Sequence, residues 1–457
     1  MKFNKDYLFT AICCSTLFFN LQAQSPGEAF TEGFNIAVDQ GYQCITDQQR
    51  ELSNQMISES IQNLKDQGKL FYNEAAKPDY IQFGWPIKQS EGVDYNQVWA
   101  ISNYVDHQSG AGIKDYFCKE RTYDGHQGTD FFLWPFWWYA MDHNQAEIVA
   151  AADGQILYKF DGNYDRSCVM GSGDWNAVYV QHADGSIAWY GHMKTGSLTT
   201  KNVGDMVSKG EFLGFVGSSG SSSGPHLHFE IYDSDNQLID PFEGSCNLLN
   251  TESWWEEQIP HDKPTINAVL THSAYPVFPD CPEQEVTNLK DHFEIGESIY
   301  LAVYLTNQEA GSTMHLKVTK PDGTILNEWD ETLTEYYQLS YSFWLVSSDM
   351  NGNWKWEVTY KGVTVVHDYY VGVMGTDENE IKDFTVFPNP VYDHINLQSS
   401  NKIVDVQIID AQGKTVKHIS RLSGIDQVDV KSLPAGFYVI KASDIQKKTS
   451  TIKFMKK

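Results

Sequence analysis

The sequence predicts a mainly β chain, in which an antiparallel-sheet domain is followed by two β-sandwich domains and preceded by a short N-terminal helix. Short alternating or apolar runs, broken by Gly, Asn and Asp-Gly pairs, recur from about residue 81 onward, as is typical of strands joined by hairpins. A hydrophobic content of 41% and an aromatic content of 14% exclude a mainly disordered chain. With 457 residues, the chain is long enough for about three domains with cores of their own.

The first 23 residues are expected to be a secretory signal peptide. Lys2 and Lys5 precede an apolar stretch that ends in small residues at Ala23. A lipoprotein attached through Cys13 or Cys14 is the alternative, but the apolar stretch continues past both cysteines. No later run is long and apolar enough to cross a bilayer, so no transmembrane segment is expected in the mature chain.

Residues 24–80 are expected to form a helical lead-in. The run TDQQRELSNQMISESIQNLKDQGKL is polar, carries apolar residues at roughly helical spacing, and offers Thr46 or Asp47 as an N-cap. The strand-rich blocks that follow have expected limits of 81–260 for the first domain, 264–374 for an accessory β-sandwich and 384–457 for a second, smaller sandwich. The acidic string MGTDENEIKD is expected to link the last two.

The formal net charge of −27 argues against a nucleic-acid partner and against adsorption to anionic lipid, because both would be repelled. It indicates nothing positive about a substrate, since an acidic surface also keeps ordinary secreted proteins soluble.

The cysteines that remain after signal removal are widely spaced in a chain expected to be exported, where disulfides form. We expect Cys118 to pair with Cys168, which would pin a long loop near the site described next. We expect Cys246 to pair with Cys281 across the boundary between the first two β domains, leaving Cys44 single. Simple buried thiols are the alternative.

A Gly/Ser tract runs directly into two histidines in the string GSSGSSSGPHLHFEIYDSD. Such tracts are usually linkers, but the alternation of HLHFEIY predicts a strand with His226 and His228 on one face, which favours a tight loop beside a site. Two further strings, YDGHQGTDF and WYGHM, contribute His126, Asp130 and His192.

His126, Asp130 and His228 would supply the three N/O ligands that zinc hydrolases use. His192 and His226 would then be free to act as a base and as a donor to the oxyanion. Spacing alone is a weak signal, because the chain has 14 histidines. No His-Glu-x-x-His string occurs, which excludes the commonest zinc-protease helix.

The strings HQGTD, YGHM, AAADGQI and VGDMVSKGEFLGFVGSSGSSSGPHLHFE resemble the lysostaphin-type (β-lytic) zinc metalloendopeptidases over roughly residues 81 to 250. The resemblance implies a grooved catalytic domain that binds Zn²⁺ through His126, Asp130 and His228. It also implies that His226 is the catalytic base and that His192 assists the oxyanion or the leaving group.

By this resemblance, the expected substrate is the peptide cross-links of bacterial peptidoglycan. A secreted protease acting on Gly-rich extracellular proteins and a non-catalytic cell-wall-binding adhesin are the alternatives. The string FFLWPFWWYAMDH departs from the minimal family domain. We expect it to be packed core or a contact with the next domain, with a groove wall as the alternative.

The block from Phe384 to Lys457 resembles the sorting domain of type IX secretion through the strings FPNP, LPAGFYVI and KFMKK. The resemblance implies export through the periplasm to the medium or the cell surface, with the type IX machinery as partner. A small sandwich used for binding is the alternative.

Overall fold

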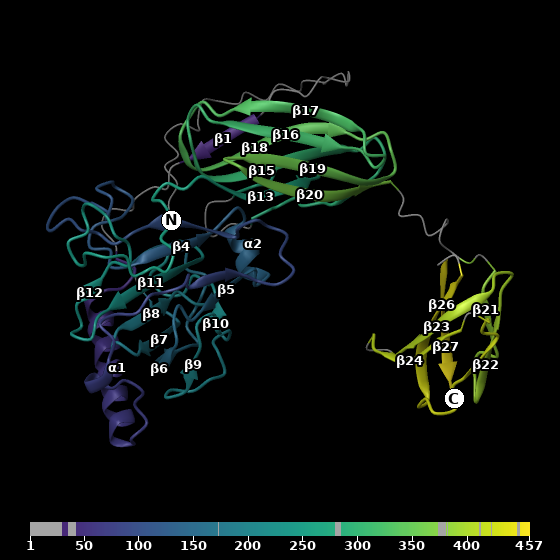
Figure 1. The fold of residues 1–457 in the computed structure, drawn as a ribbon, viewed down its shortest axis with the longest axis horizontal. Coiled ribbons are helices and arrows are strands. Elements are labelled where there is room, and N and C mark those ends of the chain that lie inside the picture. Colours follow the sequence, from purple (N-terminus) through teal and green to yellow (C-terminus); the bar gives the residue numbers. More distant parts are fainter. Residues whose placement is uncertain are drawn as a thin grey trace. The chain divides into compact units, whose positions relative to one another are not determined.

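In the computed structural model the chain forms two compact units, residues 1–372 and 373–457 (Figure 1). The structure describes residues 30–34, 43–171, 173–278, 285–372, 381, 383–410, 413–421, 423–445 and 448–457. The expected signal peptide and most of the expected acidic linker lie outside these ranges. No helix among the described residues is long and apolar enough to cross a membrane.

The expected N-terminal helix is α1, Asp47–Asp66. The Thr46 hydroxyl accepts from the backbone N–H of Gln49, and the Gln49 side chain accepts from the backbone N–H of Thr46, so a capping box starts the helix. One face, including Ile57 and Leu64, is buried. Sequence analysis missed the strand β1, Phe30–Phe34, which pairs antiparallel with the distant strand β18, Tyr337–Ser347.

The first β region is built on one large antiparallel sheet, as expected, in the order β3-β4-β11-β8-β7-β6-β9. Its strands are β3 Trp99–Asn103, β4 Thr129–Leu133, β6 Gly154–Phe160, β7 Ala177–His182, β8 Ile187–Gly191, β9 Met206–Val207 and β11 His226–Tyr232, with β12 Leu238–Ile239 beside β11. A smaller sheet joins β10 Phe212–Phe215, β5 Ala146–Val149 and β2 Ile87–Gln89. The short helices are η1 Glu74–Ala76 and α2 Trp137–Asp142. The strands β4, β11 and β8 therefore lie side by side, and these strands carry the histidine strings.

The aromatic string after Asp130 is packed core, which confirms the favoured interpretation. Trp134 and Phe136 are buried and lie against Phe278 and Tyr304, residues of the following sandwich region. Aromatic side chains bury much apolar area, so this contact joins the two regions within one compact unit.

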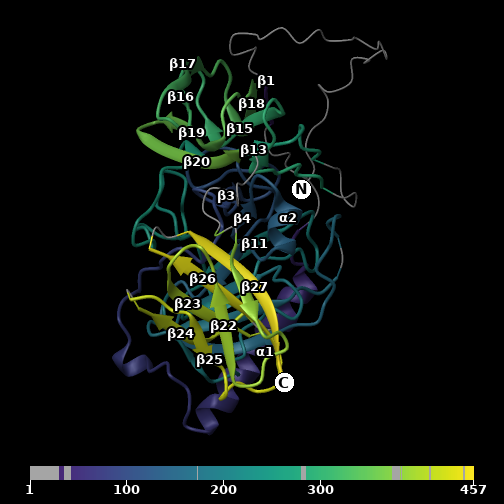
Figure 2. The ribbon, with the colours of Figure 1, turned by 90° about the vertical axis from the view of Figure 1, so that its right-hand side faces the viewer.

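The second β region is a sandwich of two sheets that face each other (Figures 1 and 2). One sheet has the order β1-β18-β15-β13, with β13 Thr265–His272 and β15 Ser298–Gln308. The other has the order β14-β20-β19-β16-β17, with β14 His292–Phe293, β16 Thr313–Thr319, β17 Ile325–Thr332, β19 Gly352–Tyr360 and β20 Val363–Val371. Trp344 and Trp356 meet between the sheets, and the Trp356 indole N–H donates to the carbonyl of Ala302.

The C-terminal unit is also a β fold, as expected, with two sheets ordered β21-β22-β25 and β24-β23-β26-β27. Its strands are β21 Thr385–Phe387, β22 His394–Gln398, β23 Ile403–Ile409, β24 Thr415–Ser420, β25 Gln427–Asp429, β26 Gly436–Asp444 and β27 Thr449–Lys456. It has its own apolar core, which includes Val406, Ile440 and Phe454.

Both expected disulfide pairings are wrong, because Cys118 is bonded to Cys246, with 5.2 Å between their Cα atoms. The loop after Phe242 returns beside Tyr116, whose carbonyl accepts from the backbone N–H of Cys246, and this contact brings the two cysteines together. Cys168 is also disulfide-bonded, and Cys281 lies outside the described residues. Cys44 is free and buried, which confirms the expectation that it is single.

Candidate metal centre

The order of three strands brings the predicted site residues together. β11 lies between β4 and β8, and its His228 is the direct cross-strand partner of both Asp130 and Gly191. His192 follows Gly191 at the end of β8, and His126 lies in the turn before β4. The histidine strings, which are far apart in the sequence, therefore converge at one place on one face of this sheet.

The three predicted ligands meet within hydrogen-bonding distance of one another. The distances are 3.2 Å from His126 Nε2 to His228 Nδ1, 2.8 Å from His228 Nδ1 to Asp130 Oδ1, and 3.3 Å from His126 Nε2 to Asp130 Oδ1. A tetrahedral zinc ion with bonds near 2.0 to 2.1 Å holds its ligand atoms about 3.3 Å apart. Two imidazole nitrogens and a carboxylate oxygen at these distances fit such an ion.

Each of these three side chains has an outer partner that fixes its orientation. His126 Nδ1 lies 2.7 Å from the Tyr104 carbonyl, and His228 Nε2 lies 2.7 Å from Glu230 Oε1. Each ring therefore donates outward and turns its other nitrogen toward the cluster. The second Asp130 oxygen accepts from the Asn103 amide at 3.0 Å.

His192 and His226 lie beside the three predicted ligands, with 4.4 Å between their ring centroids. The Gly/Ser loop fixes both rings, because its carbonyls accept from Nδ1 of each: Ser219 from His192 at 2.6 Å and Gly224 from His226 at 2.8 Å. Ser219 is buried, so this tract is a packed support for the site and the linker alternative is wrong.

Two backbone features are local requirements of this arrangement. A Cβ on Gly128 would lie 2.6 Å from His228 Nε2, so the string HQGTD needs a glycine there to admit the ring. His192 has a φ of 58°, a left-handed conformation that costs roughly 1 to 3 kcal/mol in a non-glycine residue and is concentrated at functional sites.

Burial and neighbouring charges set the ionisation of the cluster. Although burial opposes it, the nearby His126 and His226 hold the pKa of Asp130 well below its usual range, so the carboxylate is ionised. Burial, followed by the neighbouring His192, lowers the pKa of His226 to about 3, so that ring is neutral near pH 7.

A cleft opens beside the cluster. Its lining includes Asp130 and His226, and Phe132, Trp137 and Tyr123 supply aromatic surface. The aromatic string thus contributes two side chains to the cleft, although most of it is core.

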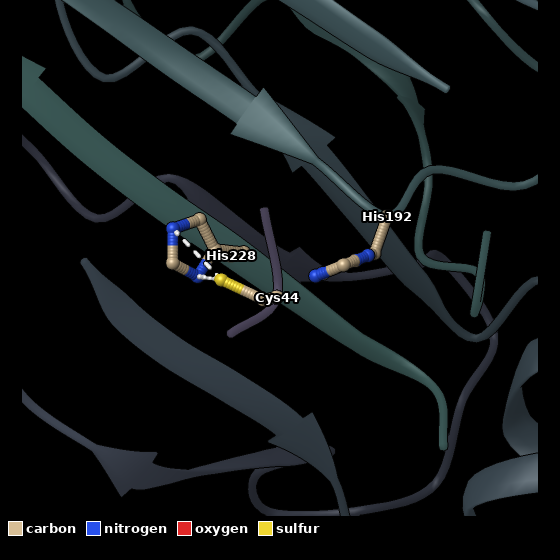
Figure 3. A group of neighbouring side chains, drawn as sticks. All are labelled: Cys44, His192 and His228. Carbon is tan, nitrogen blue, oxygen red and sulfur yellow. Dashed lines mark hydrogen bonds between the residues drawn. The ribbon is translucent and has the colours of Figure 1, made fainter. Parts of the chain in front are cut away.

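Sequence analysis missed a fourth candidate ligand, Cys44. Its sulfur lies 3.4 Å from His228 Nδ1, and Cys44, His192 and His228 form a second group whose ligand atoms lie within 4.8 Å of one another (Figure 3). Although burial acts to raise it, the charge of His228 lowers the pKa of this thiol well below its usual value.

Glu230 and Arg50 were missed as well. Arg50 lies on α1 and pairs with Glu230, which in turn accepts from His228. The strand alternation of HLHFE already put Glu230 on the face of the two histidines, and this pattern was the available signal. No local pattern pointed to Arg50.

Comparison with known proteins finds two families in the chain. Residues 125–241 match peptidase family M23, and residues 385–457 match the secretion system C-terminal sorting domain. The first range holds all the predicted ligands and both further histidines. The second begins one residue after the expected boundary at Phe384, and it marks the chain as an exported protein of the medium or the cell surface.

Individual relatives match only part of the chain. A stretch of 84 residues is 42% identical to the DD-carboxypeptidase/endopeptidase Mpg of Neisseria gonorrhoeae and covers 18% of this chain and 16% of that protein. A stretch of 119 residues is 31% identical to the glycyl-glycine endopeptidase ALE-1 of Staphylococcus capitis and covers 25% of this chain and 28% of that protein. The chain thus spans less than a third of the length of each relative.

The solved catalytic domain of lysostaphin from Staphylococcus simulans aligns at 24% identity with a TM-score of 0.21, and the alignment covers 32% of this chain and 90% of that domain. By the two family models, the chain contains a peptidase family M23 domain at residues 125–241, followed by a secretion system C-terminal sorting domain at residues 385–457.

Proposed function

We propose that this chain is a secreted zinc-dependent endopeptidase that hydrolyses the peptide cross-links of bacterial peptidoglycan. The observation that carries the proposal is the convergence of His126 Nε2, Asp130 Oδ1 and His228 Nδ1, with two further histidines beside them. These three residues would hold the ion, and two imidazole nitrogens and a carboxylate oxygen at this spacing are donors that suit Zn²⁺.

A bound Zn²⁺ supplies Lewis-acid polarisation of the scissile carbonyl and lowers the pKa of water. The residues of the chain supply the rest. His226, with Nδ1 fixed by Gly224, presents Nε2 as the base that takes a proton from the attacking water. His192, with Nδ1 fixed by Ser219, presents Nε2 toward the oxyanion or the leaving amine.

The substrate class is supported by the names of the relatives. One is a DD-carboxypeptidase/endopeptidase and another is a glycyl-glycine endopeptidase. Both names describe cleavage of peptides, and a cleft lies beside Asp130 and His226. The second name supports a Gly–Gly bond as one candidate for the bond cleaved.

Export supports the same assignment, because the sorting domain takes the chain to where a cell wall or extracellular protein can be met. We propose the type IX secretion machinery as the partner that recognises residues 384–457.

The test is to incubate the zinc-loaded chain, without residues 1–23, with purified peptidoglycan and with a pentaglycine peptide, and to identify products by mass spectrometry. The Cys44→Ser variant is run in parallel for the reason given in the next subsection. We expect new amino and carboxyl termini within peptide stems, and we expect none with the His226→Ala variant.

Retention of intact protein on unchanged wall, for the parent chain and for Cys44→Ser alike, would contradict the enzyme and favour an adhesin. Cleavage of pentaglycine with untouched peptidoglycan stems would contradict the proposed substrate and favour a protease for Gly-rich proteins.

A further inference from the structure

The N-terminal segment of residues 43–66, which comprises Cys44 and α1, lies on the candidate metal centre. The Cys44 sulfur is 3.4 Å from Nδ1 of His228, the nitrogen that also faces His126 and Asp130. Cys44 is 5% exposed, so its thiol is shielded from solvent together with the cluster. The sulfur also lies 3.7 Å from His228 Nε2, and Cys44 forms its candidate ligand group with His192 and His228.

A second observation points into the same space. His192 Nε2 is buried and has no hydrogen-bond partner among the described residues, and its ring is directed toward Cys44 (Figure 3). A buried polar atom without a partner is costly, so this nitrogen requires an occupant of the space in front of it. In the segment-bound state that neighbour is the Cys44 sulfur, within 4.8 Å.

Polar contacts fasten the segment on both sides of the cysteine. The Ser221 hydroxyl of the Gly/Ser loop donates to the Gln43 carbonyl, and the Gln49 amide donates to the Gly173 carbonyl. Arg50 forms a partly buried, two-bonded ion pair with Glu230. This last contact links α1 to the outer partner of His228.

Apolar contacts complete the attachment. Ile45, Ile57 and Leu64 share a buried cluster with aromatic side chains of the first β region, which are Tyr123, Trp175, Tyr179, Trp189 and Tyr232. The segment therefore covers an aromatic surface next to the cluster.

We propose that residues 43–66 are an inhibitory segment that keeps the peptidase latent, with the Cys44 thiolate as the fourth ligand of the metal. The inference rests on the proposed metal site of the preceding subsection. Zn²⁺ binds thiolate strongly, and a site with four protein ligands is closed, whereas a catalytic site keeps one position open. The thiol releases its proton to solvent as it binds.

Cleavage of the exposed chain that follows α1 would release the inhibitory segment. Asn73 to Tyr80 are all exposed, and apart from the single turn η1 they form no helix or strand. Cys44 is in no disulfide, and β1, which precedes the segment, is held only by its pairing with β18. The described residues before this connection therefore contact the rest of the unit only through non-covalent interactions. An endopeptidase that hydrolyses one bond of this connection consumes one water and leaves a new carboxylate and a new amine. The segment can then dissociate, and the departing thiolate takes up a proton.

The first experiment detects the sulfur ligand without using activity. The chain without residues 1–23 is loaded with Co²⁺, and its near-ultraviolet spectrum is compared with that of Cys44→Ser and of Ser58→Ala. Ser58 lies on the exposed face of α1 and serves as the matched control. We expect a thiolate-to-cobalt charge-transfer band in the parent chain and in Ser58→Ala, and no such band in Cys44→Ser at equal cobalt content.

The second experiment measures the inhibition. If the open state is a tenth or less of the population, removing the blocking ligand raises the rate of peptidoglycan cleavage about tenfold or more. We expect this increase in Cys44→Ser, and also in the parent chain after limited proteolysis between residues 73 and 80. The cleaved parent chain keeps its cysteine, so it tests the inference even if the substituted protein folds poorly.

Absence of the band from the parent chain, or equal rates for the uncleaved chain, the cleaved chain and Cys44→Ser, would overturn the inference. A band in the parent chain with no hydrolysis by any form would leave the sulfur ligand standing and overturn the proposed peptidase function. The two failures are therefore distinguishable.

Discussion

The N-terminal segment and the C-terminal unit both flank the peptidase domain in the sequence, but their physical relations to the site are opposite. The N-terminal segment belongs to the same compact unit as the cluster, and its Cys44 and Ile45 are 5% and 2% exposed. The C-terminal unit is a separate body with its own core around Val406 and Ile440. A flanking region can therefore affect the metal centre when its side chains are buried together with the cluster. Being close to the peptidase domain in the sequence is not sufficient.

This difference separates two kinds of accessory region. A region that contributes side chains to the core of the catalytic domain can change its chemistry, because each of its contacts is coupled to the site. A region with a core of its own can bind a partner without a change in the activity of the catalytic domain. The comparison therefore predicts that changes near α1 alter metal binding and hydrolysis, and that changes in the C-terminal unit do not.

The largest expected effect comes from His228, which the two candidate ligand groups share. His228→Ala should lose both bound zinc and hydrolysis, because a predicted ligand and the contact of Cys44 disappear together. Metal analysis after dialysis and the cleavage assay measure this outcome. His418→Ala is the matched control, since His418 is an exposed histidine of the C-terminal unit that pairs with Asp405. Loss of zinc from His418→Ala, or its retention in His228→Ala, would break the comparison.

An intermediate effect is expected from Glu230, the residue that joins α1 to the cluster. Glu230→Gln replaces the carboxylate that accepts from His228 and pairs with Arg50, and loss of such an outer partner typically lowers metal affinity 10- to 100-fold. Competition with a chelator of known affinity measures the change. The same substitution should make the bonds between residues 73 and 80 easier to cleave, because α1 loses its ion pair. Unchanged affinity and unchanged cleavage would show that this link is only structural packing.

The smallest effect on hydrolysis is expected from deleting residues 384–457. The remaining chain should cleave peptidoglycan at the parent rate after activation, because no predicted ligand or base lies in the deleted part. Its location should change, however, since a chain without the sorting domain should stay in the periplasm. Fractionation of expressing cells measures this outcome. Appearance of the truncated chain in the medium would contradict sorting, and a reduced rate on insoluble wall would favour a binding role.

Much of the fold and most of the candidate site could be predicted from the sequence. The alternation of HLHFEIY placed His226 and His228 on one face, and strands with hairpin signals indicated the sheets. The resemblance to a peptidase family then connected these residues with His126, Asp130 and His192. All of these signals are short sequence motifs. Such motifs can be recognised in a single sequence without knowledge of the fold.

The rest depends on contacts between distant residues, which local patterns do not encode. Cys44 lies 184 positions from its partner His228, and in the sequence it was only an unpaired cysteine. The pairing of Cys118 with Cys246 depends on how the loop after Phe242 returns to Tyr116. The strand β1 forms because β18 offers it an edge, so its own five residues carried no sufficient signal.

X-ray absorption at the zinc edge tests the central claim most directly, because it identifies the atoms bound to the ion. For the zinc-loaded chain without residues 1–23, the account predicts one sulfur at about 2.3 Å and three nitrogen or oxygen atoms at about 2.0 to 2.2 Å. After cleavage between residues 73 and 80, the sulfur should be lost and the three lighter ligands should remain. A spectrum of the intact chain with no sulfur, or one that cleavage does not change, would contradict the account.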